Sequence, residues 1–166
     1  MGEPLSAARA ADEVLFAGLY PGLRRFAAFV APVAFDPDDL VQEAAARALR
    51  GGSLSRLEAP EQYLRTAIVR LAANERRRRW RGARADERLS ASRSLVEEEV
   101  YPSDLAVIDL LAPLDRAILY VTIIDGMSRS VAAELLGMSE SALRQRLSRA
   151  LKSLRRSSEQ EEACHG

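Results

Sequence analysis

The 166-residue sequence has few of the side chains that most catalytic and metal sites use. It contains one cysteine and one histidine, Cys164 and His165, which are neighbours in a polar segment. A single cysteine excludes an internal disulfide and a cysteine-rich zinc site, and a single histidine leaves little for acid–base chemistry. Such a pair is more often part of a disordered tail than half of a metal site. Because nucleophile motifs and phosphate-binding loops are also missing, we expect no metal, no cofactor and no enzymatic activity.

Long apolar segments are missing as well. The apolar stretch 117–124, interrupted only by Thr122, is eight residues long, less than half of the roughly 20 that a membrane-spanning helix needs. The first residues lack the charged, apolar and small-residue pattern of a secretion signal. We therefore expect no membrane insertion and a cytoplasmic location.

The chain has no excess of charge of either sign, since 24 basic residues balance 24 acidic ones. Evenly distributed, this balance would argue against a nucleic-acid partner. The charges are instead segregated, with a net charge of −2 over 1–60, +6 over 61–93, −7 over 94–140, +6 over 141–156 and −3 over 157–166. Two separate basic segments are typical of a protein that contacts phosphates at two places.

Hydrophobic periodicity predicts helices nearly throughout, and no segment alternates as a strand would. Apolar residues recur every three or four positions over 12–30, where Pro21 is expected to kink or split the helix. Asp36 as a cap and Pro37 at the first helical position predict the next helix, which two glycines at 51 and 52 should end. Pro60 predicts the start of a long third helix.

The sequence therefore predicts an all-α fold made of two small helical domains. A three- or four-helix domain is expected over 10–82 and a second domain over 103–157. The segment 83–102, rich in Ser, Arg and Glu, is predicted to be a flexible linker. Residues 158–166 are predicted to be a disordered tail.

Residues 128–154, SRSVAAELLGMSESALRQRLSRALKSL, resemble a helix-turn-helix. Ala133 is small enough for a close helix crossing, Gly137 can end the first helix with a positive φ, and Ser139 can cap the second. The second helix then exposes polar residues that suit a DNA groove: Arg144, Gln145, Arg146, Ser148 and Arg149. A plain helical hairpin with a solvated basic face is the alternative.

Two further segments narrow the function: DPDDLVQEAAARALR (36–50) and PEQYLRTAIVRLAANERRRRWR (60–81). With the helix-turn-helix that follows, they resemble the signature segments of bacterial RNA polymerase sigma factors of the extracytoplasmic-function type (ECF, group IV) in the sigma-70 superfamily. The resemblance covers about residues 10–156, with the three segments in the family's order and at its spacing.

The resemblance implies that 10–82 is sigma region 2, which binds the β′ clamp of core RNA polymerase and recognises the promoter −10 element as unpaired DNA. It also implies that 103–157 is region 4, which binds the β flap and recognises the −35 element as duplex. The residues that match polymerase-binding positions are Asp39, Leu40, Gln42, Glu43 and Arg47. Two alternatives remain: Leu40 can be a core residue, and Glu43 with Arg47 can be an ordinary surface pair.

The segment 52–59 matches the family element that captures a flipped −10 base. By position, the residues implied in −10 binding are Tyr63, Arg70, Asn74, Arg77 and Arg78. Tyr63 stands where relatives usually have Trp, and Arg70 where they often have Asn. The sequence leaves open whether Tyr63 and Trp80 stack on bases or pack in the core. In region 4, Arg144 and Arg146 match phosphate-contacting positions, and Gln145, Ser148 and Arg149 match base-reading positions.

The family also implies an anti-sigma factor as a partner. The acidic residues 97–99 can mimic RNA in the polymerase channel or simply be part of a solvated linker. Two other function classes remain: a helix-turn-helix regulator that no longer binds polymerase, and a helical scaffold for a protein partner.

Overall fold

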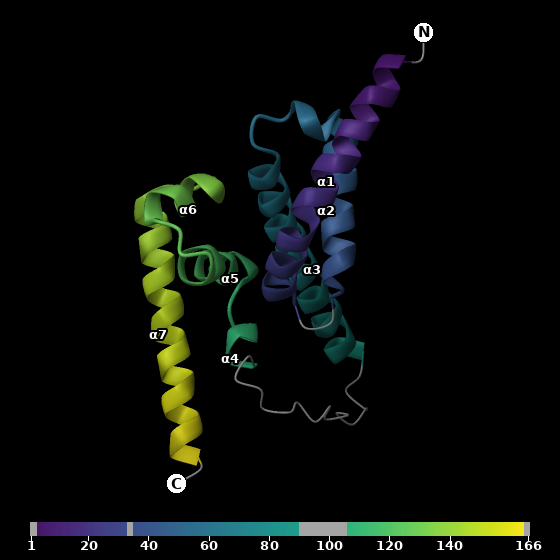
Figure 1. The fold of residues 1–166 in the computed structure, drawn as a ribbon. Coiled ribbons are helices and arrows are strands. Elements are labelled where there is room, and N and C mark those ends of the chain that lie inside the picture. Colours follow the sequence, from purple (N-terminus) through teal and green to yellow (C-terminus); the bar gives the residue numbers. More distant parts are fainter. Residues whose placement is uncertain (1–2, 33–34, 90–105, 165–166) are drawn as a thin grey trace.

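The computed structural model describes residues 3–32, 35–89 and 106–164, and every regular element in these ranges is helical (Figure 1). This confirms the all-α prediction. The elements are α1 Glu3–Val30, α2 Pro37–Gly51, η1 Leu54–Arg56, α3 Pro60–Leu89, α4 Ala106–Asp109, α5 Pro113–Leu119, η2 Tyr120–Ile124, α6 Arg129–Leu135 and α7 Glu140–Cys164. Within the described ranges, no helix has the length and apolar character needed to cross a bilayer.

The first three long helices pack side by side, with the chain reversing direction after α1 and again after α2 (Figure 1). The predicted boundary signals of α2 are confirmed. Asp36 accepts a hydrogen bond from the Asp38 amide at 2.8 Å, Pro37 is the first helical residue, and Gly52 follows the helix with φ 143°. Fully buried side chains from all three helices, such as Phe26, Val41 and Ile68, form the core of this bundle.

In the second half of the chain, α5 continues into a wider helical turn, η2, and then α6 and α7 form the predicted helix-turn-helix. Gly137 adopts φ 64° between α6 and α7, a conformation that glycine tolerates. The Ser139 hydroxyl accepts a hydrogen bond from the Ala142 amide at 3.3 Å and so caps α7. Ala133 and Leu143 are buried where the two helices cross.

Three helices are longer than the sequence suggested. α1 begins at Glu3 and runs through Pro21 without being split. α3 continues to Leu89, so the first part of the expected linker is helical, while 90–102, with the acidic residues 97–99, lies outside the described residues. α7 continues to Cys164, so that 158–164 are helical rather than disordered, and His165 lies outside the described residues. The added C-terminal segments of α3 and α7 are both rich in strong helix formers such as Ala, Glu and Arg.

The two halves of the chain share one buried cluster. The ring of Phe26 on α1 meets the ring of Tyr120 edge-on, with centroids 5.4 Å apart, and the Cζ atom of Arg65 lies over the Phe26 ring, 5.1 Å from its centroid. Arg65 also forms ion pairs with Glu61 at 2.8 Å and with Asp125 at 2.7 Å. The contact with Asp125 joins α3 to the end of η2, so region 2 and region 4 of the prediction pack against each other in this structure.

Replacing Phe26 by alanine should lower the free energy of unfolding by about 3–5 kcal/mol, the usual cost of emptying an aromatic core position. The loss is expected because the side chain is fully buried between the two halves. Urea unfolding followed by circular dichroism measures it. Val14→Ala on the same helix is the control, since Val14 is 75% exposed and should change stability by less than about 0.5 kcal/mol. Equal stabilities of the two variants would contradict the packing.

Candidate nucleic-acid interface

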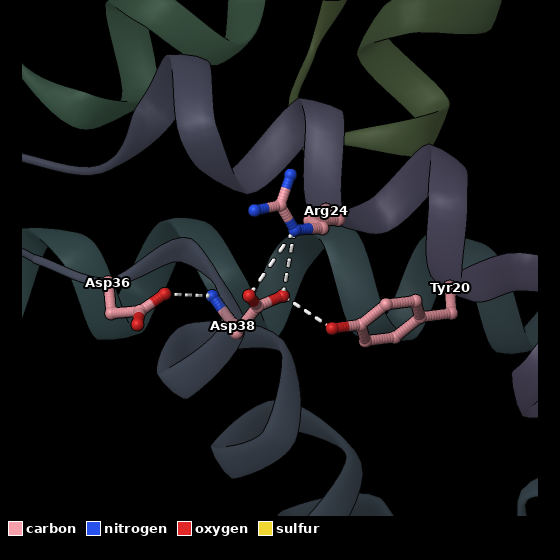
Figure 2. Close-up of polar contacts among 4 residues, drawn as sticks. All are labelled: Tyr20, Arg24, Asp36 and Asp38. Atoms are coloured by element: carbon pink, nitrogen blue, oxygen red, sulfur yellow. Dashed lines mark hydrogen bonds and ion pairs between the residues drawn. The ribbon is translucent and has the colours of Figure 1, made fainter.

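A cluster of polar side chains fixes the start of α2 against α1 (Figure 2). The Tyr20 hydroxyl donates to the Asp38 carboxylate, and Arg24 Nε lies 3.0 and 3.3 Å from the two Asp38 oxygens. The hydrogen bond from Tyr20, helped by the charge of Arg24, holds the pKa of Asp38 below its ordinary value. The same hydrogen bond raises the pKa of Tyr20. The orientation of α2 is therefore set by its first turn.

The five residues predicted to bind polymerase lie on α2 but do not share one environment. Asp39 and Gln42 are exposed, whereas Leu40 is only 3% exposed and belongs to the core. Glu43 accepts hydrogen bonds from Arg47 at 2.8 Å and from Arg50 at 3.2 Å, and the bond from Arg47 is the main cause that lowers the pKa of Glu43. Both alternatives raised by the sequence are thus present: Leu40 is core, and Glu43 pairs with Arg47.

A hollow of about 480 Å³ lies between α2 and α3, beside the second half of the segment 52–59. Tyr63 is 42% exposed and faces this hollow, so it is not a core residue. Two of its cationic neighbours, Arg47 and Arg70, line the same hollow. The full lining is Arg47, Leu57, Glu58, Ala59, Gln62, Tyr63, Thr66, Ala67 and Arg70. An aromatic ring flanked by guanidinium groups is the combination that single-stranded nucleic-acid sites use.

The predicted −10 residues continue from this hollow along one side of α3. Tyr63, Arg70, Asn74 and Arg77 are spaced by seven, four and three positions, which places them on one stripe of a helix. Asn74 and Arg77 line a second hollow, of about 860 Å³, together with Trp80. Arg77 donates to the Asn74 side-chain oxygen at 3.0 Å. Arg78 follows Asn74 by four positions, at the edge of this stripe, and pairs with Glu75 at 3.3 Å.

Trp80 is 60% exposed and borders the second hollow, so the structure places it at the surface rather than in the core. The described lining of this hollow also includes Arg76, Arg81 and Pro113. Because Pro113 is the first residue of α5, the two halves of the chain meet at this hollow.

Four of the five predicted −35 residues share one face of α7. Arg144, Gln145, Ser148 and Arg149 are exposed and line a shallow hollow of about 590 Å³. Arg146 lies about 200° around the helix from Arg144, two residues at about 100° each. It points to α5, where its Nη1 atom is 2.9 Å from the Asp115 carboxylate.

Some residues of the first hollow were not identified from the sequence. Gln62 and Thr66 precede Arg70 by eight and four positions, so helical spacing alone could have placed them there. Gln62 donates to the Glu134 carbonyl, and Thr66 donates to the Leu135 carbonyl at 3.3 Å. The end of α6 therefore contacts two residues that line the hollow, a long-range contact that no local sequence pattern indicates.

The cluster at the start of α2 predicts a pH-dependent contribution to stability. Because the folded protein lowers the pKa of Asp38, the ionised carboxylate stabilises the fold above its ordinary pKa of about 3.9, and this contribution is lost as the pH falls below that value. Asp38→Asn should therefore be less stable than the wild type at pH 6, and the difference should shrink as the pH is lowered toward about 3. Urea unfolding across this range checks it; a difference that stays constant with pH would contradict it.

Two family models match the chain: "Sigma-70 region 2" over residues 15–82 and "Sigma-70, region 4" over residues 105–154. Together they cover most of the sequence; the first spans most of the bundle α1–α3 and the second most of the helices α4–α7. No curated protein matches the sequence.

A solved structure shares the fold: the sigma factor RpoE of Bartonella quintana, crystallised in complex with the anti-sigma factor NepR. The TM-score is 0.61 at 19% sequence identity, and the match covers 87% of this chain and 94% of RpoE. With regions 2 and 4 both present and in order, the chain belongs to the sigma-70 family as an ECF-type sigma factor, a subunit that binds core RNA polymerase and directs promoter-specific initiation of transcription.

Proposed function

We propose that this sigma factor binds an unpaired base of the −10 element in the hollow between α2 and α3. The observation that carries the proposal is the exposed ring of Tyr63 in a hollow that Arg47 and Arg70 also line. A base that leaves the duplex loses its stacking interactions with the neighbouring bases. Stacking on an aromatic side chain contributes about 1–3 kcal/mol of binding free energy in their place. Binding energy of this size favours the melted state without any catalytic step, so the protein acts as a binding subunit with no enzymatic activity of its own.

The stripe on α3 extends the site beyond one base. Asn74 and Arg77 follow Arg70 on the same side of the helix, and Trp80 offers a second exposed ring. Arg78 adds positive charge beside the stripe. We propose that the unpaired strand runs along this surface, with the arginines at its phosphates.

The exposed face of α7 is the proposed −35 reader. Arg149 and Gln145 lie side by side, 3.4 Å apart at their hydrogen-bonding atoms, and both side chains can make two hydrogen bonds to one base edge. Ser148 lies on the same face, and Arg144 is placed for a phosphate contact. Because Arg146 pairs with Asp115, we assign it to holding α7 on α5 in place of a DNA contact.

The exposed side of α2 is the proposed contact with the β′ clamp. Asp39 and Gln42 supply open polar groups, and the paired Glu43 and Arg47 border them. Leu40 contributes indirectly, because its burial fixes the helix on the bundle. The second half of the chain, 103–157, is the proposed β-flap contact, and the cytoplasm is the proposed location.

An anti-sigma factor is a further proposed partner, because the structurally similar RpoE was crystallised with one. We propose that such a partner covers the same exposed faces of α2 and α7. The sequence identity of 19% supports the fold alone, so the identity of the partner has to come from copurification with the chain.

A helix-turn-helix regulator that has lost polymerase binding is the alternative function. Titration of core RNA polymerase with the chain separates the two. A stable complex that produces a run-off transcript supports the sigma factor, whereas DNA binding with no complex supports the regulator.

The double substitution Asp39→Ala and Gln42→Ala should weaken binding to core polymerase by at least about tenfold, because truncation of two polar contacts at an interface costs about 1–3 kcal/mol. The unfolding midpoint should change little, since both side chains are exposed. Arg9→Ala with Glu13→Ala, an exposed pair on α1, is the matched control. Unchanged core affinity in the double variant would contradict the assignment of α2.

The α7 face predicts distinct effects of its arginines on duplex −35 DNA. Arg144→Ala should lower affinity for all sequences alike and reduce the slope of log affinity against log salt by about one, whereas Arg149→Ala should relax the preference at one base pair. Arg146→Ala, on the opposite side of the same helix, is the control and should change the slope less than Arg144→Ala. Fluorescence anisotropy at several salt concentrations measures these effects. A larger effect of Arg146 than of Arg144 would refute the assigned face.

A further inference from the structure

The segment 52–59, which borders the proposed −10 hollow, is tied at its first half to a single buried carboxylate on α1. Asp12 is 9% exposed. Its Oδ1 atom accepts hydrogen bonds from the Ser53 hydroxyl and from the Ser55 amide, both at 2.7 Å. The two partners are 41 and 43 residues away in the sequence.

We propose that Asp12 is a positioning residue for −10 recognition: by holding Ser53 and Ser55 it fixes the segment 52–59, and with it the wall of the hollow that receives the unpaired base. The inference rests on the proposed function of that hollow. Asp12 itself does not line the hollow and does not touch the DNA in this proposal.

The contacts of the segment explain how the restraint is transmitted. Ser53 stands at the N-cap position of η1, yet its hydroxyl makes no capping bond and donates to Asp12. Leu54, between the two tied residues, is 2% exposed and inserted in the core. The next residues, 57–59, form the wall of the hollow, and the Ala59 carbonyl accepts a bond from the Tyr63 amide at 3.0 Å.

Thus one end of the segment is fixed on α1 and the other end leads directly into Tyr63. Leu54 holds the segment only by non-directional apolar contact. The two hydrogen bonds to Asp12 add direction, because a displaced segment would leave the Ser55 amide without its acceptor.

The ionised form of Asp12 suits this role. The hydrogen bond from the Ser55 amide, followed by that from Ser53, lowers the pKa of Asp12, so the carboxylate is charged at neutral pH. Hydrogen bonds to a charged acceptor are roughly twice as strong as those between neutral groups. Because the segment is already fixed before the base arrives, less conformational entropy is lost when the base binds. The affinity for the base is therefore higher.

The experiment uses holoenzyme assembled from core RNA polymerase and the full chain. A preferred single-stranded −10 oligonucleotide is first selected from a randomised pool with the wild-type holoenzyme. Asp12→Ala should bind this oligonucleotide about tenfold more weakly and discriminate less against single-base changes, as expected for the loss of charge-assisted hydrogen bonds. Affinity for core polymerase and for duplex −35 DNA should remain at the wild-type level.

Three further variants separate positioning from general destabilisation. Asp12→Asn keeps an acceptor oxygen without the charge and should retain part of the affinity. Ser53→Ala removes one of the two hydrogen bonds and should weaken oligonucleotide binding less than Asp12→Ala does. The double variant Asp12→Ala with Ser53→Ala should bind little more weakly than Asp12→Ala alone. Glu13→Ala changes the adjacent, exposed carboxylate, which pairs with Arg9, and should behave as wild type.

Hydrogen exchange in the free chain gives a readout that does not depend on DNA. The Ser55 amide should exchange faster in Asp12→Ala, whereas amides in the middle of α2 should keep their protection. If Asp12→Ala does not fold, the same measurements of −10 binding and of Ser55 amide exchange are made on Asp12→Asn and Ser53→Ala.

Wild-type −10 affinity and selectivity in Asp12→Ala holoenzyme would overturn the inference. So would a parallel loss of core, −35 and −10 binding, which indicates general unfolding. A wild-type holoenzyme that selects no single strand would instead show that the proposed function of the hollow is wrong, even if the Ser55 amide exchanges as expected.

Discussion

The short connection between α2 and α3 is the constraint on which the functional surfaces of region 2 depend. α2 ends at Gly51, and Gly52 adopts a backbone conformation, φ 143°, that residues with a side chain rarely take. α3 begins at Pro60, so the chain must reverse within the segment 52–59. This reversal sets α2 beside α3, and Arg47 from one helix and Tyr63 from the other then line a common hollow. The side of α2 proposed to face polymerase and the stripe of α3 proposed to face DNA are consequently held in a fixed relation.

The neutral net charge of the chain conceals two different uses of its arginines. Arg65 and Arg116 are buried, and they pair with acidic residues: Arg65 with Glu61 and Asp125, and Arg116 with Asp109 at 2.9 Å. The pairs with Asp125 and Asp109 join different elements, whereas the pair with Glu61 lies within α3, and both arginines are withdrawn from the surface. The arginines on the outer sides of α3 and α7 are exposed, and they produce the two basic segments seen in the sequence. The net charge is therefore zero only for the chain as a whole, and the proposed DNA-binding surfaces are locally basic.

Features that depend on neighbouring residues could be predicted from the sequence, because their causes act within a few positions. The cap at Asp36, the break at Gly52 and the turn at Gly137 are of this kind. The face of a helix that meets another helix depends on the distant partner. For that reason the sequence did not show that Arg146 turns to Asp115, that Tyr63 is exposed, or that Asp12 reaches Ser53. The full lengths of α3 and α7 could not be predicted, because the polar composition of their C-terminal ends suits both a solvated helix and a linker.

The central claim is that one chain selects promoters through two separate surfaces. The most direct test is to supply core RNA polymerase with this protein and let it transcribe a library of randomised promoters. Sequencing the transcribed templates shows which positions are enriched. We expect two short blocks of enriched bases at a fixed separation, upstream of the start sites, with selectivity in the nearer block reduced by Tyr63→Ala and in the farther block by Arg149→Ala. No transcription above that of core enzyme alone, or enrichment of a single block that both substitutions alter equally, would contradict the two-surface assignment.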